Sequence, residues 1–342
     1  MMTAEEILNV TEPGRIFTGD PSTLKAEYRK LSFKWHPDRN KERTDEVFGH
    51  IHNLYKLADE MLAKGLWVTP GVLLLCDKKT KQKFQIKYSR HHSIDIGEMY
   101  YSRTTVTFMI DPKYKNLFQN ALKFSKGFKF ASDNMKKDIH RYLPTILKDF
   151  ETETHFVVVI KKTPDLILLR DAVEFLGGIG EKHVAWIQSS LHNLACYFSW
   201  AKITHNDISM DTYFISPEFH SGAILGGWWY AKEVGNKLVA VPKRTYGYIP
   251  PAVLASKKAN TSVDLELIRL TGRELLGDST GLSLLKNKAA HSVVINWLRC
   301  AATSDPITDY RLWGDVLTKA YGKRKFIELK FNLDKFYERK DK

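Results

Sequence analysis

The stretch LKAEYRKLSFKWHPDRN, residues 24–40, decides how the amino-terminal part of the chain folds. Its apolar side chains recur at spacings of four, three and four, which places them on one face of a helix: Leu24, Tyr28, Leu31 and Trp35. The other faces carry the basic side chains Lys25, Arg29, Lys30 and Lys34. Pro37 predicts the end of this helix, because proline disfavours the helical conformation of His36 and has no N–H to donate.

A second apolar stripe follows in DEVFGHIHNLYKLADEML, residues 45–62. It consists of Val47, Ile51, Leu54, Ala58 and Leu62, widened by Phe48 and Tyr55. The pattern therefore predicts two antiparallel helices, joined by an exposed polar loop that contains His36, Pro37 and Asp38.

Together with a short helix expected over residues 4–8, these segments resemble a J-domain over roughly residues 3 to 65. The resemblance implies that the basic helix docks a DnaK-type ATPase chaperone, and that His36, Pro37 and Asp38 trigger ATP hydrolysis by this partner. A basic helical face favours an acidic partner surface mainly through steering and orientation. The alternative for the four basic side chains is an ordinary solvated face.

Bulk composition limits the remaining options. The chain has 342 residues, 43% of them hydrophobic, so we expect two or three domains with buried cores. Its cysteines at positions 76, 196 and 300 have no spacing typical of a zinc site or a disulfide framework, which fits a reducing cytoplasmic setting. No apolar run approaches the roughly eighteen residues of a membrane span, and the sequence begins without a signal-peptide pattern. These features predict a soluble protein with no membrane partner.

Charge is distributed unevenly along the chain. The whole chain has a net charge of +13. Residues 1–65 have a net charge of −1, so residues 66–342 have a net charge of +14. The basic residues of the second part alternate with aromatic residues such as Phe124, Phe128 and Phe130, a combination compatible with weak nucleic-acid binding. The alternative is a solvated, soluble surface.

Beyond residue 66 the pattern predicts strands first and helices later. Residues 72–75 and 83–88 flank a polar turn at 77–82, which is typical of a hairpin. Residues 155–160 and 166–169 also read as strands. A long amphipathic helix is expected over 181–200, from the spacing of Val184, Ile187, Leu191, Leu194 and Phe198.

After this helix come His205-Asn206-Asp207-Ile208 and two apolar runs, 213–215 and 223–225. This order resembles the catalytic loop and metal-binding strand of the protein-kinase-like fold, and the resemblance spans about residues 68 to 320. It implies that Lys87 corresponds to the lysine that contacts nucleotide phosphates and Asp138 to the acidic partner of that lysine. It further implies that Asp207 corresponds to the catalytic aspartate and Asp264 to the aspartate of the central buried helix. Residues 246–251, YGYIPP, resemble the end of an activation segment.

The departures from that fold concern the metal and the nucleotide. Phosphoryl transfer in kinases uses magnesium held by an asparagine after the catalytic aspartate and by an aspartate on the next strand. Here Thr212 and Gly227 stand at these two places, and neither supplies a carboxylate. Residues 73–84 also lack the glycines that let a backbone approach phosphates. We therefore expect a pseudokinase with no catalytic residues, no metal and no cofactor.

Three other groups of residues have a plainer interpretation. His205 is expected to be structural, buried against the activation segment, and Asp207 is expected to keep a hydrogen-bonding role that orders its own loop. The pair His91-His92 has no third ligand at a suitable spacing, so it is interpreted as part of a solvent-exposed turn. Core packing is the expectation for the aromatic run 228–230, WWY.

The sequence thus predicts an α+β protein with an all-α J-domain helical hairpin at 1–66 and a two-lobed protein-kinase-like domain. Its N-lobe is expected at 67–175 and its mostly helical C-lobe with a basic tail at 176–342. The expected function is a co-chaperone that stimulates a DnaK-type ATPase, while the kinase-like body recognises or tethers a client protein or assembly. The alternatives are an atypical protein kinase or small-molecule phosphotransferase, and a basic nucleic-acid-binding adaptor.

Overall fold

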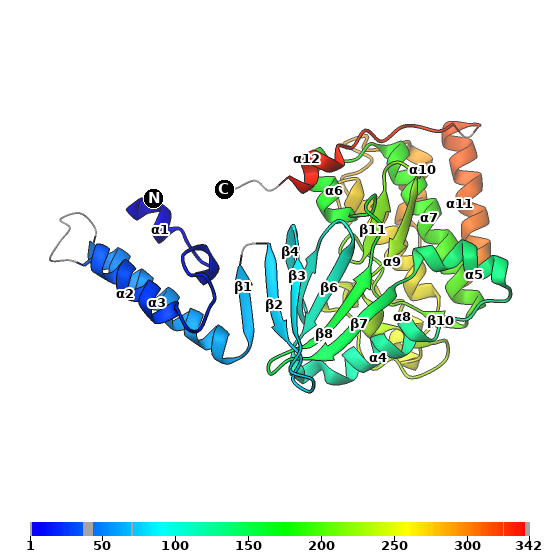
Figure 1. Ribbon diagram of the computed structural model, residues 1–342. Coiled ribbons are helices and arrows are strands. Elements are labelled where there is room, and N and C mark those ends of the chain that lie inside the picture. Colours follow the sequence, from blue (N-terminus) through cyan, green and yellow to red (C-terminus); the bar gives the residue numbers. More distant parts are fainter. Residues whose placement is uncertain (1, 37–43, 70, 324, 339–342) are drawn as a thin grey trace. The chain divides into compact units, whose positions relative to one another are not determined.

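The computed structural model describes residues 2–36, 44–69, 71–323 and 325–338 and combines helices with β-sheets, which confirms the α+β prediction (Figure 1). The chain divides into two compact units. The first unit comprises Met1–Ser102, Thr107–Lys113 and Lys148–Val159, and the second comprises Arg103–Val106, Tyr114–Leu147 and Ile160–Lys342. The three-part division expected from the sequence remains a prediction.

The first unit begins with the helices α1 (Ala4–Leu8), α2 (Leu24–Lys34) and α3 (Thr44–Ala63). Helix α2 packs against α3, and both predicted apolar stripes face inward, with Leu24, Val47, Ile51, Leu54 and Ala58 buried. The rings of Tyr28 and Tyr55 stack between the two helices with centroids 4.2 Å apart. The two predicted helices are therefore confirmed, whereas the loop with Pro37 and Asp38 lies outside the described residues.

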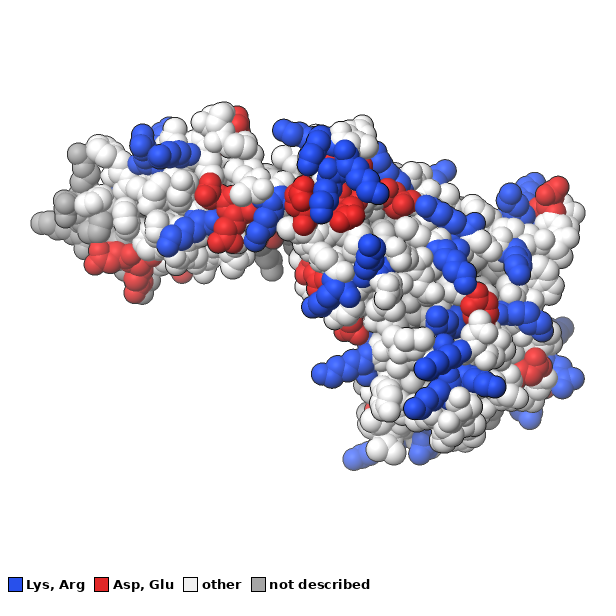
Figure 2. Space-filling model, turned by 90° about the horizontal axis from the view of Figure 1, so that it is seen from below, with Lys and Arg blue, Asp and Glu red and all other residues white. Residues whose placement is uncertain are grey.

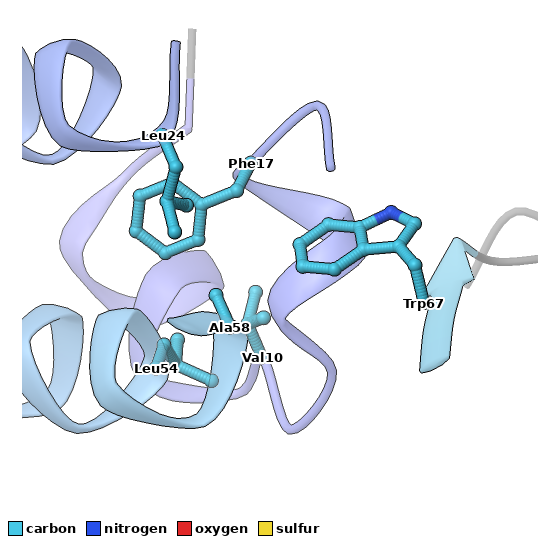
Figure 3. Close-up of a cluster of buried hydrophobic side chains, with 6 residues drawn as sticks. All are labelled: Val10, Phe17, Leu24, Leu54, Ala58 and Trp67. Carbon is cyan, nitrogen blue, oxygen red and sulfur yellow. The ribbon is translucent and has the colours of Figure 1, made fainter. Parts of the chain in front are cut away.

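Trp67 closes the core of these helices, although it belongs to the strand that follows them (Figure 3). Its side chain is 2% exposed and packs in one cluster with Val10, Phe17, Leu24, Leu54 and Ala58. Gly19 makes room for the indole ring: a Cβ at this position would lie 2.1 Å from Nε1 of Trp67. The helical core and the first β-sheet thus share one large side chain.

Two sheets complete the first unit. The strands of the first sheet, in the order β1-β2-β3, are β1 (Leu66–Thr69), β2 (Val72–Cys76) and β3 (Lys83–Lys87). Strands β2 and β3 pair antiparallel with Val72 opposite Lys87, which confirms the predicted hairpin. The second sheet has the order β4-β5-β6-β8-β7 and consists of β4 (Arg90–Ile94), β5 (Gly97–Tyr101), β6 (Thr105–Ile110), β7 (Thr145–Glu151) and β8 (Phe156–Lys161). Leu73 and Leu75 of β2 join Tyr100, Met109 and Val157 in one core.

The pair His91-His92 lies in strand β4 and not in a turn, so that interpretation is wrong. Residues Arg90–Ile94 pair with β5 along the whole strand. Nε2 of His91 lies 2.7 Å from Oε2 of Glu98 on β5, and the ring of His91 stacks on Tyr100 with centroids 4.5 Å apart. The partners that fix this polar strand come from across the sheet, and the local sequence does not reveal them.

The second unit is mostly helical. Its helices are α4 (Lys115–Lys126), α5 (Asp133–Ile139), α6 (Leu169–Leu176), α7 (Glu181–Trp200), α8 (Pro251–Ser256), α9 (Ser262–Leu275), α10 (Ser292–Arg299), α11 (Pro306–Tyr321) and α12 (Leu333–Tyr337). One small sheet consists of β10 (Ile203–Thr204) and β13 (Lys232–Glu233). The other has the strand order β12-β11-β9 and consists of β12 (Ser221–Ile224), β11 (Tyr213–Ser216) and β9 (Ile167–Leu168). Helix α7 matches the long helix expected from the sequence. The predicted strand at 166–169 shortens to β9, because α6 begins at Leu169.

A buried charged group holds α7, α9 and α11 together. The guanidinium of Arg269 donates to both carboxylate oxygens of Asp309, at 2.8 and 3.0 Å, and Nε2 of His192 lies 3.1 Å from the same carboxylate. Burial alone raises the pKa of Asp309, but the hydrogen bonds from His192 and Arg269 outweigh it and hold the pKa well below its usual range. Since all three side chains are at most 2% exposed, removal of one partner would leave a buried charge uncompensated.

Within the described part of the chain, no helix has both the length and the apolar character needed to cross a membrane. The aromatic run Trp228, Trp229 and Tyr230 is buried, which confirms its expected place in the core.

Candidate functional site

Helix α2 presents the basic surface that the sequence predicts. Its apolar residues pack on α3, so the remaining faces point to solvent, and the side chains of Lys25, Arg29, Lys30 and Lys34 are all exposed. The ammonium group of Lys34 lies 5.4 Å from the ring centroid of Trp35, at the carboxyl end of the helix. The helix thus offers four cations at its surface, where an anionic partner surface can reach them.

His36 follows Trp35, the residue that caps the carboxyl end of α2, and is exposed. Its ring meets that of Phe48 on α3 edge to face, with centroids 5.7 Å apart. This contact places the imidazole against α3. Pro37 and Asp38 lie outside the described residues.

A second candidate site surrounds Asp264 at the start of α9 in the second unit. Its buried carboxylate accepts hydrogen bonds from the backbone N–H of His205, at 2.8 Å, and from that of Asn206, at 2.7 Å. Nε2 of His205 lies 2.9 Å from the carbonyl oxygen of Gly226. The side-chain amide of Asn206, a residue with a φ of +64°, donates to the carbonyl of Tyr230. These bonds fix the loop that carries Asp207.

Asp207 is held by a guanidinium. Nη2 of Arg244 donates to Oδ1 of Asp207 at 2.6 Å, and Nη1 of Arg244 lies 3.4 Å from Oδ2 of Asp211. Arg170 also binds Asp211, with Nη2 at 2.7 Å from Oδ2. Burial by itself lowers the pKa of Arg244, but Asp207 and Asp211 outweigh it and raise that pKa. Arg244 therefore supplies fixed positive charge beside the carboxylate of Asp207.

The two expected metal positions do not fit a hard divalent cation. The hydroxyl of Thr212 donates to the backbone carbonyl of Asp207 at 2.6 Å, so it closes the loop. Gly227 has a φ of +81°, and a Cβ built there would lie 2.5 Å from Cε1 of His205 and 3.0 Å from Oδ2 of Asp207. An aspartate cannot replace this glycine without displacing its neighbours, and magnesium prefers several oxygen ligands.

Burial controls the ionisation of this network. It lowers the pKa of His205 to about 3, although the bond to Gly226 acts in the opposite direction. Burial also raises the pKa of Asp264 to about 7, although the N–H groups of His205 and Asn206 act in the opposite direction. At neutral pH His205 is therefore a neutral ring and does not carry a charge into the site.

The structure brings together only part of the predicted kinase-like set. Asp207, Thr212, Gly227 and Asp264 belong to one network. Lys87 is exposed at the end of β3 in the first unit, and Asp138 is exposed on α5. No hydrogen bond among the described residues joins Asp138 to this network.

Sequence reasoning missed Arg244, Asp211 and Arg170, which hold the loop of Asp207. Asp211 could have been found, because it is a second carboxylate four residues after Asp207. No sequence pattern singles out Arg244 or Arg170. Among the described residues, no group of three or more histidine, cysteine, aspartate or glutamate side chains is arranged to hold a metal ion.

Comparison with known proteins supports the assignment of a J-domain. A segment of 46 residues is 44% identical to the chaperone protein DnaJ of Dichelobacter nodosus (strain VCS1703A). This segment is 13% of the present chain and spans 12% of the length of that protein. No family model matches the chain. The similarity thus supports a J-domain, and it does not extend to a kinase-like domain.

Proposed function

We propose that this protein is a J-domain co-chaperone that stimulates a DnaK-type ATPase, and that residues 67–342 form a protein-kinase-like scaffold without phosphotransfer activity. The observation that carries the proposal is the position of exposed His36 at the end of the exposed basic helix α2, in a chain with a DnaJ-like segment. The scaffold then has the role of recognising or tethering a client.

The surface chemistry supports docking of an acidic partner. Lys25, Arg29 and Lys30 are exposed on a helix whose other face is anchored in the core. Exposed charges of this kind raise the association rate and orient the encounter, and salt screens them over about 8 Å at physiological ionic strength. A rigid helix keeps these charges and His36 in a constant arrangement.

The chemistry around Asp207 supports an inactive scaffold. The developing charge of phosphoryl transfer needs metal ions bound by oxygen ligands. Here Arg244 already neutralises Asp207, Thr212 bonds to the backbone, and no side chain fits at Gly227. The contacts of Asp264 with the backbone of His205 and Asn206 give it a structural role, since they hold the loop in place.

ATP turnover by a DnaK-type chaperone tests the co-chaperone proposal. The full chain is used, because Trp67 is part of the helical core and a fragment that ends at residue 66 lacks it. Wild type is expected to stimulate turnover, and His36→Gln is expected to abolish the stimulation. His91→Gln is the matched control, since His91 lies exposed on β4. Equal stimulation by wild type and folded His36→Gln contradicts the proposal.

Charge reversal tests the docking surface. Arg29→Glu with Lys30→Glu is expected to slow association with the chaperone and to flatten its dependence on salt. Lys56→Glu with Lys64→Glu serves as the control, because it changes the net charge by the same amount. Lys56 is exposed on α3, and Lys64 is exposed directly after the end of α3. An unchanged association rate in the α2 variant would assign these residues to a merely solvated face.

Magnesium and ATP test the scaffold. The full chain is expected to show no magnesium-dependent thermal stabilisation by ATP, and no transfer of labelled phosphate to itself or to a generic protein substrate. Transfer that rises with magnesium and is lost in Asp207→Asn would support the phosphotransferase alternative instead.

A further inference from the structure

A cavity of about 590 Å³ in the second unit has a basic lining that neither candidate site explains. It is surrounded by α5 and the turn after it, the start of β7, the segment 161–166 and Leu225. Its lining includes the cationic side chains Lys136, Lys137, Arg141, Lys161 and Lys162, together with His140. Asp133 is the only carboxylate among the described lining residues.

Four of these cations are available to a ligand. Lys136, Lys137, Arg141 and Lys161 are exposed, and none of them forms an ion pair among the described residues. Arg141 lies over the ring of Tyr142, with its guanidinium carbon 4.6 Å from the centroid. This cation–π contact lies on the ring face and consumes no N–H group, so the guanidinium can still donate hydrogen bonds to an anion.

Lys162 has a different role. Its ammonium group is buried and donates to the carbonyl oxygens of Arg103, at 2.8 Å, and Leu166, at 2.7 Å, and it lies 3.1 Å from the hydroxyl of Tyr337. It therefore braces the wall of the cavity while the exposed cations face solvent.

The floor of the cavity is apolar. Leu143, Leu166 and Leu225 line it and are at most 7% exposed. Leu225 donates its N–H to the carbonyl of Thr212 and directly precedes Gly226, the partner of His205. A molecule in the cavity would thus contact Leu225, whose backbone is hydrogen bonded to Thr212 near Asp207.

We propose that this cavity binds a small soluble ligand with at least two phosphate groups and an apolar or aromatic part. Four exposed cations match the charge of such a ligand, and arginine and lysine form short charge-assisted hydrogen bonds with phosphate oxygens. The volume falls within the range of about 300–1,000 Å³ that small-molecule sites occupy. The three leucines of the floor offer an apolar surface to the apolar or aromatic part of the ligand.

Concavity favours a small ligand over nucleic acid. Lys and Arg side chains are spread over the face of the molecule in Figure 2, with smaller groups of Asp and Glu between them, so basic character alone does not define a site. Here the cations surround a cavity, whereas sites for single strands track the backbone along a groove with stacking aromatic side chains.

Calorimetric titration of the full chain with inorganic pyrophosphate tests the proposal, with inorganic phosphate as the less charged probe. Pyrophosphate is expected to bind more tightly than phosphate. Lys137→Glu with Arg141→Glu is expected to weaken pyrophosphate binding about tenfold or more. Lys286→Glu with Arg311→Glu changes the net charge equally at exposed positions away from the cavity and should retain binding.

A second, milder variant keeps the test decisive if Lys137→Glu with Arg141→Glu fails to fold. Lys136→Ala with Lys161→Ala removes two cations without adding carboxylates and should also weaken binding, with the circular dichroism spectrum unchanged. Equal weakening in the Lys286 and Arg311 control overturns the proposal, as does the absence of pyrophosphate binding. Binding of a single-stranded oligonucleotide that pyrophosphate does not displace would assign the surface to nucleic acid. Binding to phosphatidic acid vesicles without binding of free pyrophosphate would assign it to lipid, and both results overturn the proposal.

Discussion

Gly227 is the residue whose backbone conformation and surroundings most restrict the site around Asp207. Its φ of +81° lies in the left-handed region, and His205 and Asp207 occupy the space where a side chain would project. A side chain is therefore sterically excluded at this position, so aspartate substituted here would have to displace His205 or Asp207.

Alanine at Gly227 tests this steric argument. Gly227→Ala combines left-handed strain of about 1–2 kcal/mol with overpacking of about 1–3 kcal/mol against His205. Gly235→Ala is the control, because Gly235 has a similar φ of +85° and open space around its Cβ. In urea unfolding, Gly227→Ala should lower the free energy of unfolding more than Gly235→Ala. Equal losses would mean that strain alone acts at Gly227.

His205 gives the site a pH response. Burial lowers its pKa to about 3 in the folded state from 6.5, so the unfolded chain binds the proton first. The stabilisation from the neutral ring is fully present above pH 6.5 and is lost as pH falls towards 3. Asp264 acts in the opposite direction: its pKa rises from 3.8 to about 7, so stability falls as pH rises between these values.

The comparison of wild type with His205→Gln isolates the histidine. The difference in free energy of unfolding, wild type minus variant, should increase by about 1.4 kcal/mol per pH unit between pH 4 and 6. It should level off above pH 7, and the variant alone should become less stable as Asp264 ionises. Urea unfolding at a series of pH values measures both; a difference independent of pH would mean that His205 is accessible to protons in the folded state.

At the scale of the element, Trp67 on β1 is the connection between the amino-terminal helices and the sheet that follows. Its indole packs between Gly19 and the cluster of Val10, Phe17 and Leu24 (Figure 3). The sequence alone placed the end of the helical module just before this residue, because hydrophobic periodicity ends there, and the core continues through the next strand.

Truncation of Trp67 should destabilise the helices α1 to α3. Trp67→Ala removes a side chain that is 2% exposed, with an expected loss of about 3–5 kcal/mol in free energy of unfolding. Trp67→Phe should lose much less, since it keeps most of the packing and removes an indole N–H that has no hydrogen-bond partner in the described structure. Trp200→Ala, at a side chain that is 45% exposed, is the control. Similar losses for the two alanine variants would contradict a role of Trp67 in the core.

Elements with strong periodicity were predictable and those with distant partners were not. Helices α2, α3 and α7 and the hairpin β2–β3 follow from apolar spacing within single segments. Strand β4 was missed, because the sequence RHHSI is polar and its pairing with β5 depends on Glu98 and Tyr100. Around Asp207 the sequence indicated Asp264, Thr212 and Gly227 by their order, whereas Arg244 is set by the fold, since it lies 37 residues away from its partner.

At the scale of the whole molecule, the proposed co-chaperone chemistry and the proposed scaffold depend on different residues. In the proposed function, stimulation of a chaperone depends on α2, His36 and the core that Trp67 closes, all in the first unit. The packing of helices α7, α9 and α11 against one another depends on the buried side chains of Arg269, Asp309 and His192 in the second unit. Damage to one set should therefore leave the function of the other measurable.

Asp309→Asn separates the two sets in the full chain. The change leaves Arg269 buried without its charged partner, so the second unit should lose about 3–5 kcal/mol in free energy of unfolding. Differential scanning calorimetry should show a lower melting temperature, and stimulation of the DnaK-type ATPase should match wild type at temperatures below that transition. Trp67→Ala should give the converse result, with lost stimulation. If Asp309→Asn abolishes stimulation while the protein is still folded, the second unit takes part in activating the chaperone, and its role is then more than recognition or tethering.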